Sequence, residues 1–374
     1  MSAADGADLL VVGAGIVGLA HALAGARRGM RVVVIERDHR CVGASIRNFG
    51  FITITGQPAG DTWRRAMASR AVWAEVAPQA GIAIEHQGLW VLARRERAMA
   101  VLDAFARTEM GAACELVPAS ALPVRAPVLR AAGAQGALWS PHELRVESRT
   151  AIPRLAQWLA QAHGVRFCFG EQVLEVDTPR VRTATRQWHA ERVVVCPGTE
   201  LTGVALPVLA RHALRLTRLQ MLRVKPRQGF RLGAGVMADL SLVRYGGYSA
   251  LPEAAPLLAQ LRAEVPASLA AGIHLIVVQS ADGSLVVGDS HHDDASPQPF
   301  ASEAVDALIL GHLREAVAVD ALEVVERWTG VYPVGAAADC VIESPDPATR
   351  VVVVSSGTGA STAFGIAADV FQNW

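Results

Sequence analysis

A glycine-rich turn between an apolar strand and a helix restricts the fold of this chain more than any other segment. Residues 8–12 (Asp-Leu-Leu-Val-Val) lead into Gly13, Gly15 and Gly18, and a second apolar run ends in Glu36. Gly13 permits the tight turn, Gly15 lets a pyrophosphate approach the backbone, and Gly18 lets the helix pack on the strand. Glu36 can accept hydrogen bonds from ribose hydroxyls. Because the motif has the strand, helix and acid that it requires, we predict a dinucleotide-binding βαβ unit rather than an ordinary βα turn.

The composition of the 374 residues excludes several classes of protein. Lys plus Arg number 35, as do Asp plus Glu, so no overall charge favours nucleic acid as a partner. Outside the glycine turn, no uncharged run of about twenty apolar residues predicts an integral membrane segment. The five cysteines are odd in number and include no close pair. We therefore expect a reduced, cytoplasmic protein without disulfides or structural zinc.

The order of apolar patterns predicts an α/β (α+β) chain with two interleaved domains. The nucleotide-binding domain is Rossmann-like and is expected from residues 1–82, 145–206 and 326–374. Alternating strand patterns dominate the rest, so residues 83–144 and 207–325 are expected to form a substrate-binding domain on a mostly antiparallel sheet.

Three later segments favour FAD over NAD as the dinucleotide. Residues 43–50 (Gly-Ala-Ser-Ile-Arg-Asn-Phe-Gly) form a small, polar loop whose Ser, Arg and Asn can donate to phosphate or ring carbonyls; the alternative is a surface turn. A strand from Arg192 ends in a turn at Gly198 that can pass beneath the cofactor. Residues 356–361 begin the last helix, whose N-terminus can face the flavin pyrimidine ring, where negative charge collects on reduction.

This order of segments resembles the FAD-dependent oxidoreductases of the D-amino-acid oxidase superfamily, in the branch of glycine oxidase, sarcosine oxidase and D-amino-acid dehydrogenase. The resemblance implies that the glycines and Glu36 hold the ADP half of FAD, that the backbone at Val173 touches the adenine, and that Gly357 and Gly359 cup the flavin. The residues expected to bind FAD are Gly13, Gly15, Ile16, Val17, Gly18, Glu36, Arg37, Ala44, Ser45, Arg47, Asn48, Phe49, Gly50, Val173, Pro197, Gly198, Gly330, Gly357, Thr358, Gly359, Ala360, Ser361 and Thr362.

A narrower similarity is to the subgroup of this superfamily that is linked with aminophosphonate breakdown. It rests on five segments of this sequence: residues 47–50 with 56–58, and residues 244–248, 279–285, 288–291 and 327–332. The subgroup resemblance implies a small aminophosphonate as the substrate.

Two departures from the amino-acid oxidases concern the segment Trp328-Thr329-Gly330-Val331-Tyr332-Pro333. Those enzymes often have an arginine where Tyr332 stands, and it pairs with the substrate carboxylate. A neutral phenol cannot form that bidentate pair, which argues against a simple α-amino acid held in the usual way. Sarcosine oxidases carry a flavin-linked cysteine near this position, which Val331 and Tyr332 cannot replace and from which Cys340 is too distant in sequence. We therefore expect non-covalent FAD.

The expected residues of the reacting site are Arg47, Asn48, Arg244, Tyr245, Tyr248, His291 and Tyr332. Arginine offers a fork of donors for phosphonate oxygens, and histidine adds charge when it is protonated. The tyrosines, the only three in the chain, can orient an amine or an acid oxygen. The alternatives are a surface arginine at 244 and packed core aromatics. We expect no metal site, because the residues after His291 are typical of a polar loop.

Together these observations predict an FAD enzyme that oxidises a small anionic amine to an imine, which water hydrolyses to an aldehyde and an amine. The leading substrate is 2-aminoethylphosphonate or its N-methyl derivative. The alternatives are a secondary or D-amino acid, a 2-hydroxy acid, or a flavoprotein that only carries electrons. Oxygen or another acceptor takes the electrons, and no motif decides between them.

Overall fold

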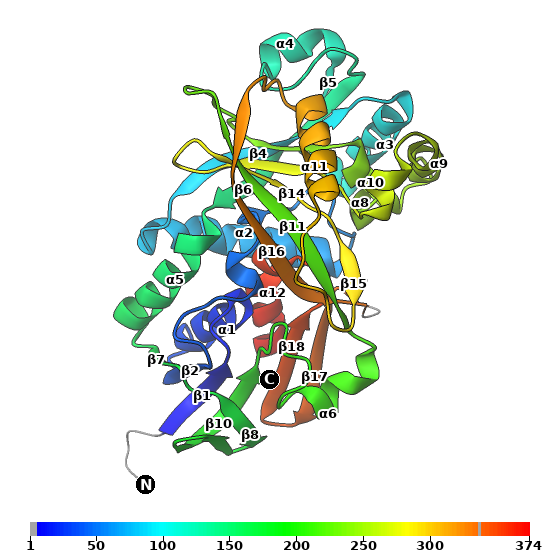
Figure 1. Ribbon diagram of the computed structural model, residues 1–374. Helices are drawn as coiled ribbons and strands as arrows, with labels where there is room; N and C mark the ends of the chain where they lie inside the picture. The colour runs from blue at the N-terminus through cyan, green and yellow to red at the C-terminus, as the bar shows by residue number, and fades with distance from the viewer. Residues whose placement is uncertain (1–5, 336–337) are drawn as a thin grey trace.

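Two β-sheets organise the chain, and segments far apart in the sequence build each of them (Figure 1). The computed structural model describes residues 6–335 and 338–374. Residues 1–5 and 336–337 of the predicted nucleotide-binding domain lie outside the described residues.

The first sheet has the strand order β17-β18-β10-β1-β2-β7. Strand β9 pairs with the first residues of β10 and with β8. Strands β18, β10, β1, β2 and β7 run parallel, and β17 and β9 pair antiparallel to their neighbours. The strands are β1 (Gly6–Val12), β2 (Val32–Glu36), β7 (Arg166–Phe169), β8 (Val173–Asp177), β9 (Arg180–Thr183), β10 (Gln187–Val195), β17 (Cys340–Asp346) and β18 (Thr349–Val354). The continuous apolar runs in β1 and β2 match strands that are covered on both faces.

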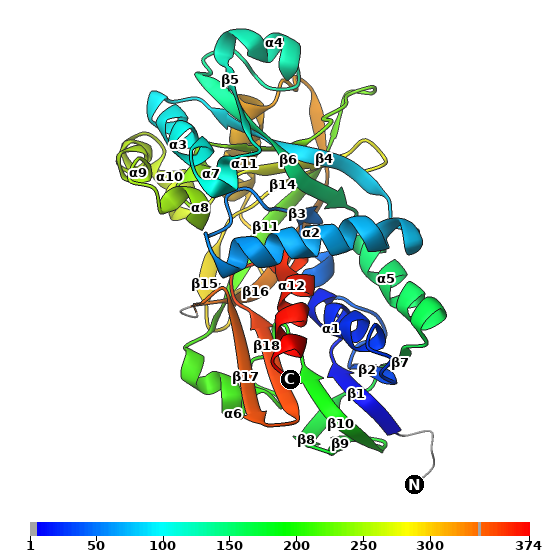
Figure 2. The ribbon, with the colours of Figure 1, turned by 180° about the vertical axis from the view of Figure 1, so that it is seen from behind.

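Helices α1 (Ile16–Ala26), α2 (Asp61–Gln79), α5 (Ser148–His163) and α12 (Gly359–Gln372) pack together on one face of this sheet (Figure 2). The hairpin β8–β9 and the short α6 (Leu206–Leu209) contribute to a separate core on the other face. Gly18 allows α1 to pack closely on the turn before it. A Cβ at Gly18 would lie only 1.9 Å from the carbonyl oxygen of Gly13. The predicted Rossmann-like unit is therefore confirmed.

The second sheet has the order β15-β11-β14-β13-β12-β4-β6-β3, with β16 paired to β11 and β5 paired to β6. All its pairs are antiparallel except β12 with β4, so the expected mostly antiparallel sheet is confirmed. The strands are β3 (Phe51–Ile52), β4 (Ile84–Ala93), β5 (Glu115–Pro118), β6 (Gly136–Val146), β11 (Arg215–Pro226), β12 (Gly235–Ala238), β13 (Ile276–Gln279), β14 (Leu285–Gly288), β15 (His292–Asp294) and β16 (Leu322–Val334).

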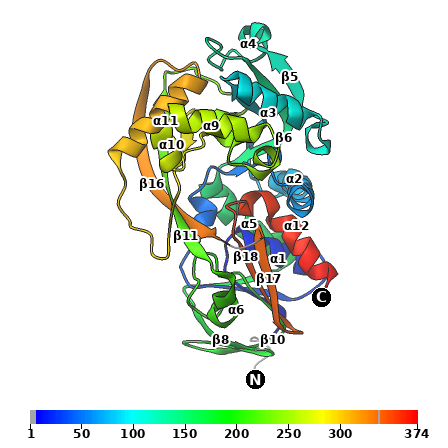
Figure 3. The same cartoon turned by 90° about the vertical axis from the view of Figure 1, so that its right-hand side faces the viewer.

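Helices build the core of the second domain against this sheet (Figure 3). They are α3 (Glu96–Ala106), α4 (Leu122–Arg125), α7 (Asp239–Leu242), α8 (Gly246–Ser249), α9 (Ala254–Glu264), α10 (Pro266–Ala270) and α11 (Glu303–Ala316). A fully buried cluster around Leu102, Phe105 and Leu313 fills the space between helices and strands.

The predicted domain boundaries differ from the sheets in three places, one of which is residues 145–146, the end of β6 in the second sheet. Residues 326–334 were expected in the nucleotide-binding domain, but they continue β16, which pairs with β11 along the second sheet. Residues 51–52 likewise form β3 at the edge of that sheet. The reason is that β16 and β3 run from one domain toward the other. Their backbone hydrogen bonds to β11 and β6 make them part of the second sheet.

Candidate active site

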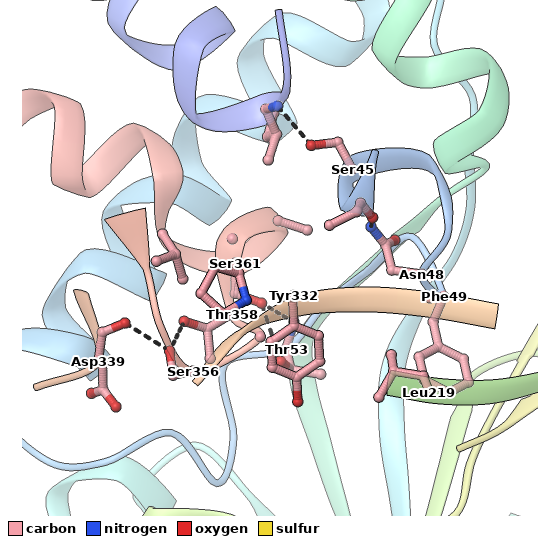
Figure 4. Close-up of a pocket in the computed structure, with 18 of the residues that line it drawn as sticks. Ser45, Asn48, Phe49, Thr53, Leu219, Tyr332, Asp339, Ser356, Thr358 and Ser361 are labelled. Atoms are coloured by element: carbon pink, nitrogen blue, oxygen red, sulfur yellow. Dashed lines mark hydrogen bonds between the residues drawn. The ribbon is translucent and has the colours of Figure 1, made fainter. Parts of the chain in front are cut away.

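A cavity of about 370 Å³ lies where the two domains meet, and Figure 4 shows part of its lining. The start of α1, the loop after β2, the start of α12 and the C-terminal part of β16 line it. The predicted site residues that line it are Gly15, Ile16, Val17, Gly18, Ala44, Ser45, Arg47, Asn48, Phe49, Gly198, Arg244, Tyr245, His291, Gly330, Tyr332, Gly357, Thr358, Gly359, Ala360 and Ser361.

The N-terminus of α1 forms one wall of the cavity. Gly13 has φ +102°, a conformation that favours glycine, and a Cβ there would lie 2.5 Å from the carbonyl oxygen of Cys196. The helix has no capping side chain at Gly15 and no acid in its first turn. Ser45 supplies the one hydroxyl that accepts from the Ile16 N–H, at 2.9 Å. This terminus can therefore receive a pyrophosphate.

The Glu36 carboxylate lies next to the glycine turn. It accepts from the Ala14 N–H at 2.8 Å and from the Asp38 N–H at 3.1 Å. These two bonds hold the half-buried carboxylate at the end of β2, where the motif places the ribose. Arg37, by contrast, is exposed to solvent and pairs with Glu200 at 2.9 Å.

The loop between β2 and β3 is held by its own hydrogen bonds. The Asn48 side chain donates to the Ala44 carbonyl at 2.8 Å and accepts from the Gly50 N–H at 2.6 Å. The Arg47 Nε donates to the Val42 carbonyl at 2.6 Å. Asn48 is thus committed to shaping the loop, whereas the Nη atoms of Arg47 are not ion-paired within the described residues.

A second helix N-terminus, that of α12, faces the same cavity (Figure 4). Its cap residue Thr358 has no side-chain capping bond, and its first turn contains no acid. Ser361 in that turn accepts from the Thr53 N–H at 2.9 Å, which ties α12 to β3. Gly357 has φ +72°, and a Cβ there would lie 2.8 Å from the Tyr332 ring. Two helix N-termini without an acid in the first turn give one cavity the partial positive charge that favours a pyrophosphate and a reduced flavin.

The other end of the cavity is polar and aromatic. The rings of Tyr332 and His291 lie 6.0 Å apart between centroids, and His291 lies 4.8 Å from His274. The Tyr245 hydroxyl lies 3.3 Å from Nε2 of His274. Arg244, which is exposed and lines the cavity, has no ion pair with a carboxylate among the described residues. Its guanidinium acts on Tyr332, where it opposes the rise in pKa that burial causes.

Burial sets the charge of these groups. It lowers the pKa of His274 and of His291 well below the usual range, so both imidazoles are neutral at pH 7. It raises the pKa of Tyr245 and of Tyr332, so both phenols keep their protons. Burial also raises the pKa of Asp289 to about 7, and the Arg244 guanidinium acts in the opposite direction.

Eight predicted site residues are absent from the cavity lining. They are Gly13, Glu36, Arg37, Gly50, Val173, Pro197, Thr362 and, as a correction to the expected reacting site, Tyr248. Tyr248 is fully buried in the second core, with its ring 4.6 Å from that of Phe105 and against Gly56. Gly13 and Gly50 have positive φ angles in the loops next to the lining, and Thr362 in α12 donates to the Thr358 carbonyl at 3.0 Å. Val173 is buried in the core beside the first sheet, and its contact with adenine stays a prediction.

The sequence patterns did not identify His274 and Asp289, a titratable pair at the substrate end of the cavity. Asp289 stands between Gly288 and His291 in a segment that the subgroup resemblance includes, but its type alone gave no reason to choose it over Asp293 or Asp294. His274 precedes the apolar strand β13, a position at which histidines are common in cores. Only the fold brings the two together, at 3.3 Å between Nδ1 and Oδ1.

Comparison with known proteins identifies the family and the fold. The family model described as "FAD dependent oxidoreductase" matches residues 8–372. Glycine oxidase from Geobacillus kaustophilus is similar in structure, with TM-score 0.76 and 18% identity over 99% of this chain and 95% of the other. L-proline dehydrogenase from P. horikoshii has TM-score 0.75 and 15% identity over 99% and 94%.

The L-α-glycerophosphate oxidase from Mycoplasma pneumoniae, solved with FAD bound, has TM-score 0.74 and 16% identity over 99% of this chain and 95% of the other. A search of the curated proteins finds no significant match. Among the described residues, no helix is long and apolar enough to span a membrane. The solved structures support the fold, and the match of the family model over nearly the whole sequence shows that this chain is a member of the FAD-dependent oxidoreductase family, with FAD as its cofactor.

Proposed function

We propose that this protein oxidises a small amine that carries an anionic group, with 2-aminoethylphosphonate or its N-methyl derivative as the leading substrate. The observation that carries the proposal is the cation at the substrate end of the cavity. Arg244 faces the cavity without a carboxylate partner among the described residues, and Tyr332 stands where related amino-acid oxidases often have an arginine.

The anionic end of the substrate is expected at Arg244, with Arg47 as a second donor. A guanidinium offers several N–H groups to the three oxygens of a phosphonate, and the Tyr332 hydroxyl supplies one more hydrogen bond. Both arginines line the cavity, and neither is paired with a carboxylate among the described residues. His291 is neutral there, so it adds no positive charge to the anion site.

The chemistry follows from the cofactor and the enclosing walls. When bound, FAD accepts a hydride equivalent from the carbon that bears the nitrogen. The chain's own residues orient the amine, keep the acid end at the arginines and surround the reacting carbon with Leu219, Ile276 and Tyr332. The imine that leaves is hydrolysed to an aldehyde and an amine, and oxygen or another acceptor takes the electrons from the cofactor.

A secondary or D-amino acid of the glycine or sarcosine type, or a 2-hydroxy acid, is the second candidate, and structural neighbours that include a glycine oxidase and a proline dehydrogenase support it. A carboxylate substrate would also have to use Arg47 or Arg244.

The test is anaerobic reduction of the bound flavin by matched pairs of compounds that differ only in the acid group. We expect 2-aminoethylphosphonate to bleach the flavin faster than 3-aminopropanoate, and aminomethylphosphonate faster than glycine. Sarcosine, D-alanine and 2-hydroxyglutarate complete the panel. Faster bleaching by the carboxylates would exclude the aminophosphonate and leave the second candidate.

A further inference from the structure

A buried cluster of one aspartate and two histidines lies at the substrate end of the cavity, and the function proposed above gives it no task. Asp289, His274 and His291 all line the cavity, and their side chains are 4 to 6% exposed. Nδ1 of His274 lies 3.3 Å from Oδ1 of Asp289, and Nε2 of His291 lies 3.8 Å from Oδ2.

Hydrogen bonds from outside the cluster decide which atoms face its centre. Nδ1 of His291 donates to the Gly272 carbonyl at 3.0 Å, so Nε2 of that ring presents a lone pair. His274 uses Nε2 toward the Tyr245 hydroxyl at 3.3 Å. Nδ1 of His274 and Oδ1 of Asp289 are buried without a hydrogen bond in the described structure. Oδ1 of Asp289 and the lone pair on Nε2 of His291 are therefore acceptors that an ammonium group in the cavity can satisfy.

We propose that Asp289, which is flanked by His274 and His291, takes the proton from the ammonium group of the substrate. This inference rests on the function proposed above. An alkyl amine carries a proton at neutral pH, since its pKa is near that of lysine at about 10.4. The nitrogen needs a free lone pair before its neighbouring carbon can lose hydride. An N–H bond breaks, its electron pair stays on nitrogen, and an O–H bond forms on Asp289.

The electrostatics around Asp289 fit a proton acceptor that works near neutrality. The other titratable and charged groups that act on this cluster are Arg244, Tyr245, Tyr332, His292 and Asp293. Arg244 favours the ionised carboxylate, whereas burial opposes it and raises the pKa to about 7. Both histidines and both tyrosines stay neutral, so Asp289 is the group facing the amine that changes charge near pH 7. The positive charge of Arg244 disfavours a metal cation in the same space.

The first experiment measures the pH dependence of anaerobic flavin reduction in Asp289→Asn. In the native holoenzyme, the reduction rate constant divided by Kd rises with pH and levels off above about 7. In the variant, it falls on the order of 10²- to 10³-fold at pH 7 and climbs about tenfold per pH unit toward the pKa of the free amine. If Asp289 had only a structural role, a higher pH would not restore the reduction rate of the variant. Asp294→Asn, the same change at an exposed carboxyl outside the cavity lining, serves as the matched control and should keep the native profile.

The second experiment measures binding to the native holoenzyme and needs no variant. The ligands are 2-amino-2-methylpropylphosphonate, which has no hydrogen on the carbon bearing nitrogen, and nitrogen-free 2-methylpropylphosphonate. As the pH falls below about 7, binding of the amine should weaken more steeply than binding of the nitrogen-free ligand, by up to tenfold per pH unit, because protonation of the phosphonate is common to both ligands.

Identical pH profiles in native protein and Asp289→Asn, or equal pH dependence of the two ligands, would overturn the proposal. So would one tightly bound transition-metal ion per chain in the purified protein. The reduction assay uses whichever amine bleaches the flavin fastest, and the ligand pair is built on that amine. A failure of the phosphonate preference therefore remains distinguishable from a failure of Asp289.

Discussion

Replacing Arg244 by alanine removes the guanidinium that we assign to the anionic end of the substrate. The side chain lines the cavity, and no carboxylate among the described residues neutralises it. A hydrogen bond to a charged group contributes about 1.5–3 kcal/mol. Since about 1.4 kcal/mol corresponds to tenfold in affinity, the loss of one such bond predicts a Kd for 2-aminoethylphosphonate that is raised roughly 10- to 150-fold.

The same substitution has an electrostatic consequence at Asp289. Arg244 lowers the pKa of that carboxyl, which burial otherwise raises to about 7. Without the guanidinium this pKa rises, so the carboxylate is less ionised at pH 7 and a higher pH is needed for full activity. The rising limb of the pH profile should therefore move to higher pH in Arg244→Ala.

Stopped-flow flavin reduction under anaerobic conditions separates the two effects, because it yields Kd and the limiting rate constant at each pH. Propylamine, which lacks the acid group, is the comparison substrate and should lose little affinity. Arg227→Ala, an exposed arginine outside the cavity lining, is the matched control. Equal losses of affinity for propylamine and 2-aminoethylphosphonate would refute the assignment of Arg244 to the acid group.

Three further predictions concern the cofactor and the stability of the fold. Gly18→Ala places a methyl group 1.9 Å from the carbonyl oxygen of Gly13, so we expect purified protein with little FAD and a lower Tm by thermal unfolding; native flavin content would contradict this. Precipitation with acid should release all flavin into the supernatant, and flavin that stays with a peptide would show a covalent link. Burial lowers the pKa of His21 to about 4, below its unfolded value of about 6.5. The unfolded state therefore binds more protons between these values, and stability is lost by about 1.4 kcal/mol per unit as the pH falls from 6.5 to 4. Urea unfolding should show part of this slope disappear in His21→Asn, and an unchanged slope would count against the buried neutral ring.

The first sheet was predictable because its signals are local. The strand before Gly13, the glycines themselves and the acid at Glu36 lie within one βαβ unit, so periodicity and spacing suffice to place them. The loop at Ser45 and the helix start at Thr358 were also found, because small polar residues next to glycine mark backbone that a ligand can approach.

The substrate end was predicted only in part, because it depends on pairings between distant segments. Tyr245 and Tyr248 have the same type and nearly the same position, yet the short α8 puts one in the cavity and the other in the core. The meeting of His274 with Asp289 likewise follows from β13 pairing with β14. No pattern within either segment encodes that contact.

One single-turnover experiment decides between the proposed substrate class and its rival. Excess protein is mixed anaerobically with equal amounts of 2-aminoethylphosphonate and 3-aminopropanoate, and the products are identified by NMR. The account predicts the phosphonate aldehyde and ammonia, with 3-aminopropanoate largely intact. Preferential consumption of 3-aminopropanoate, or bleaching of the flavin without cleavage of a C–N bond, would contradict it.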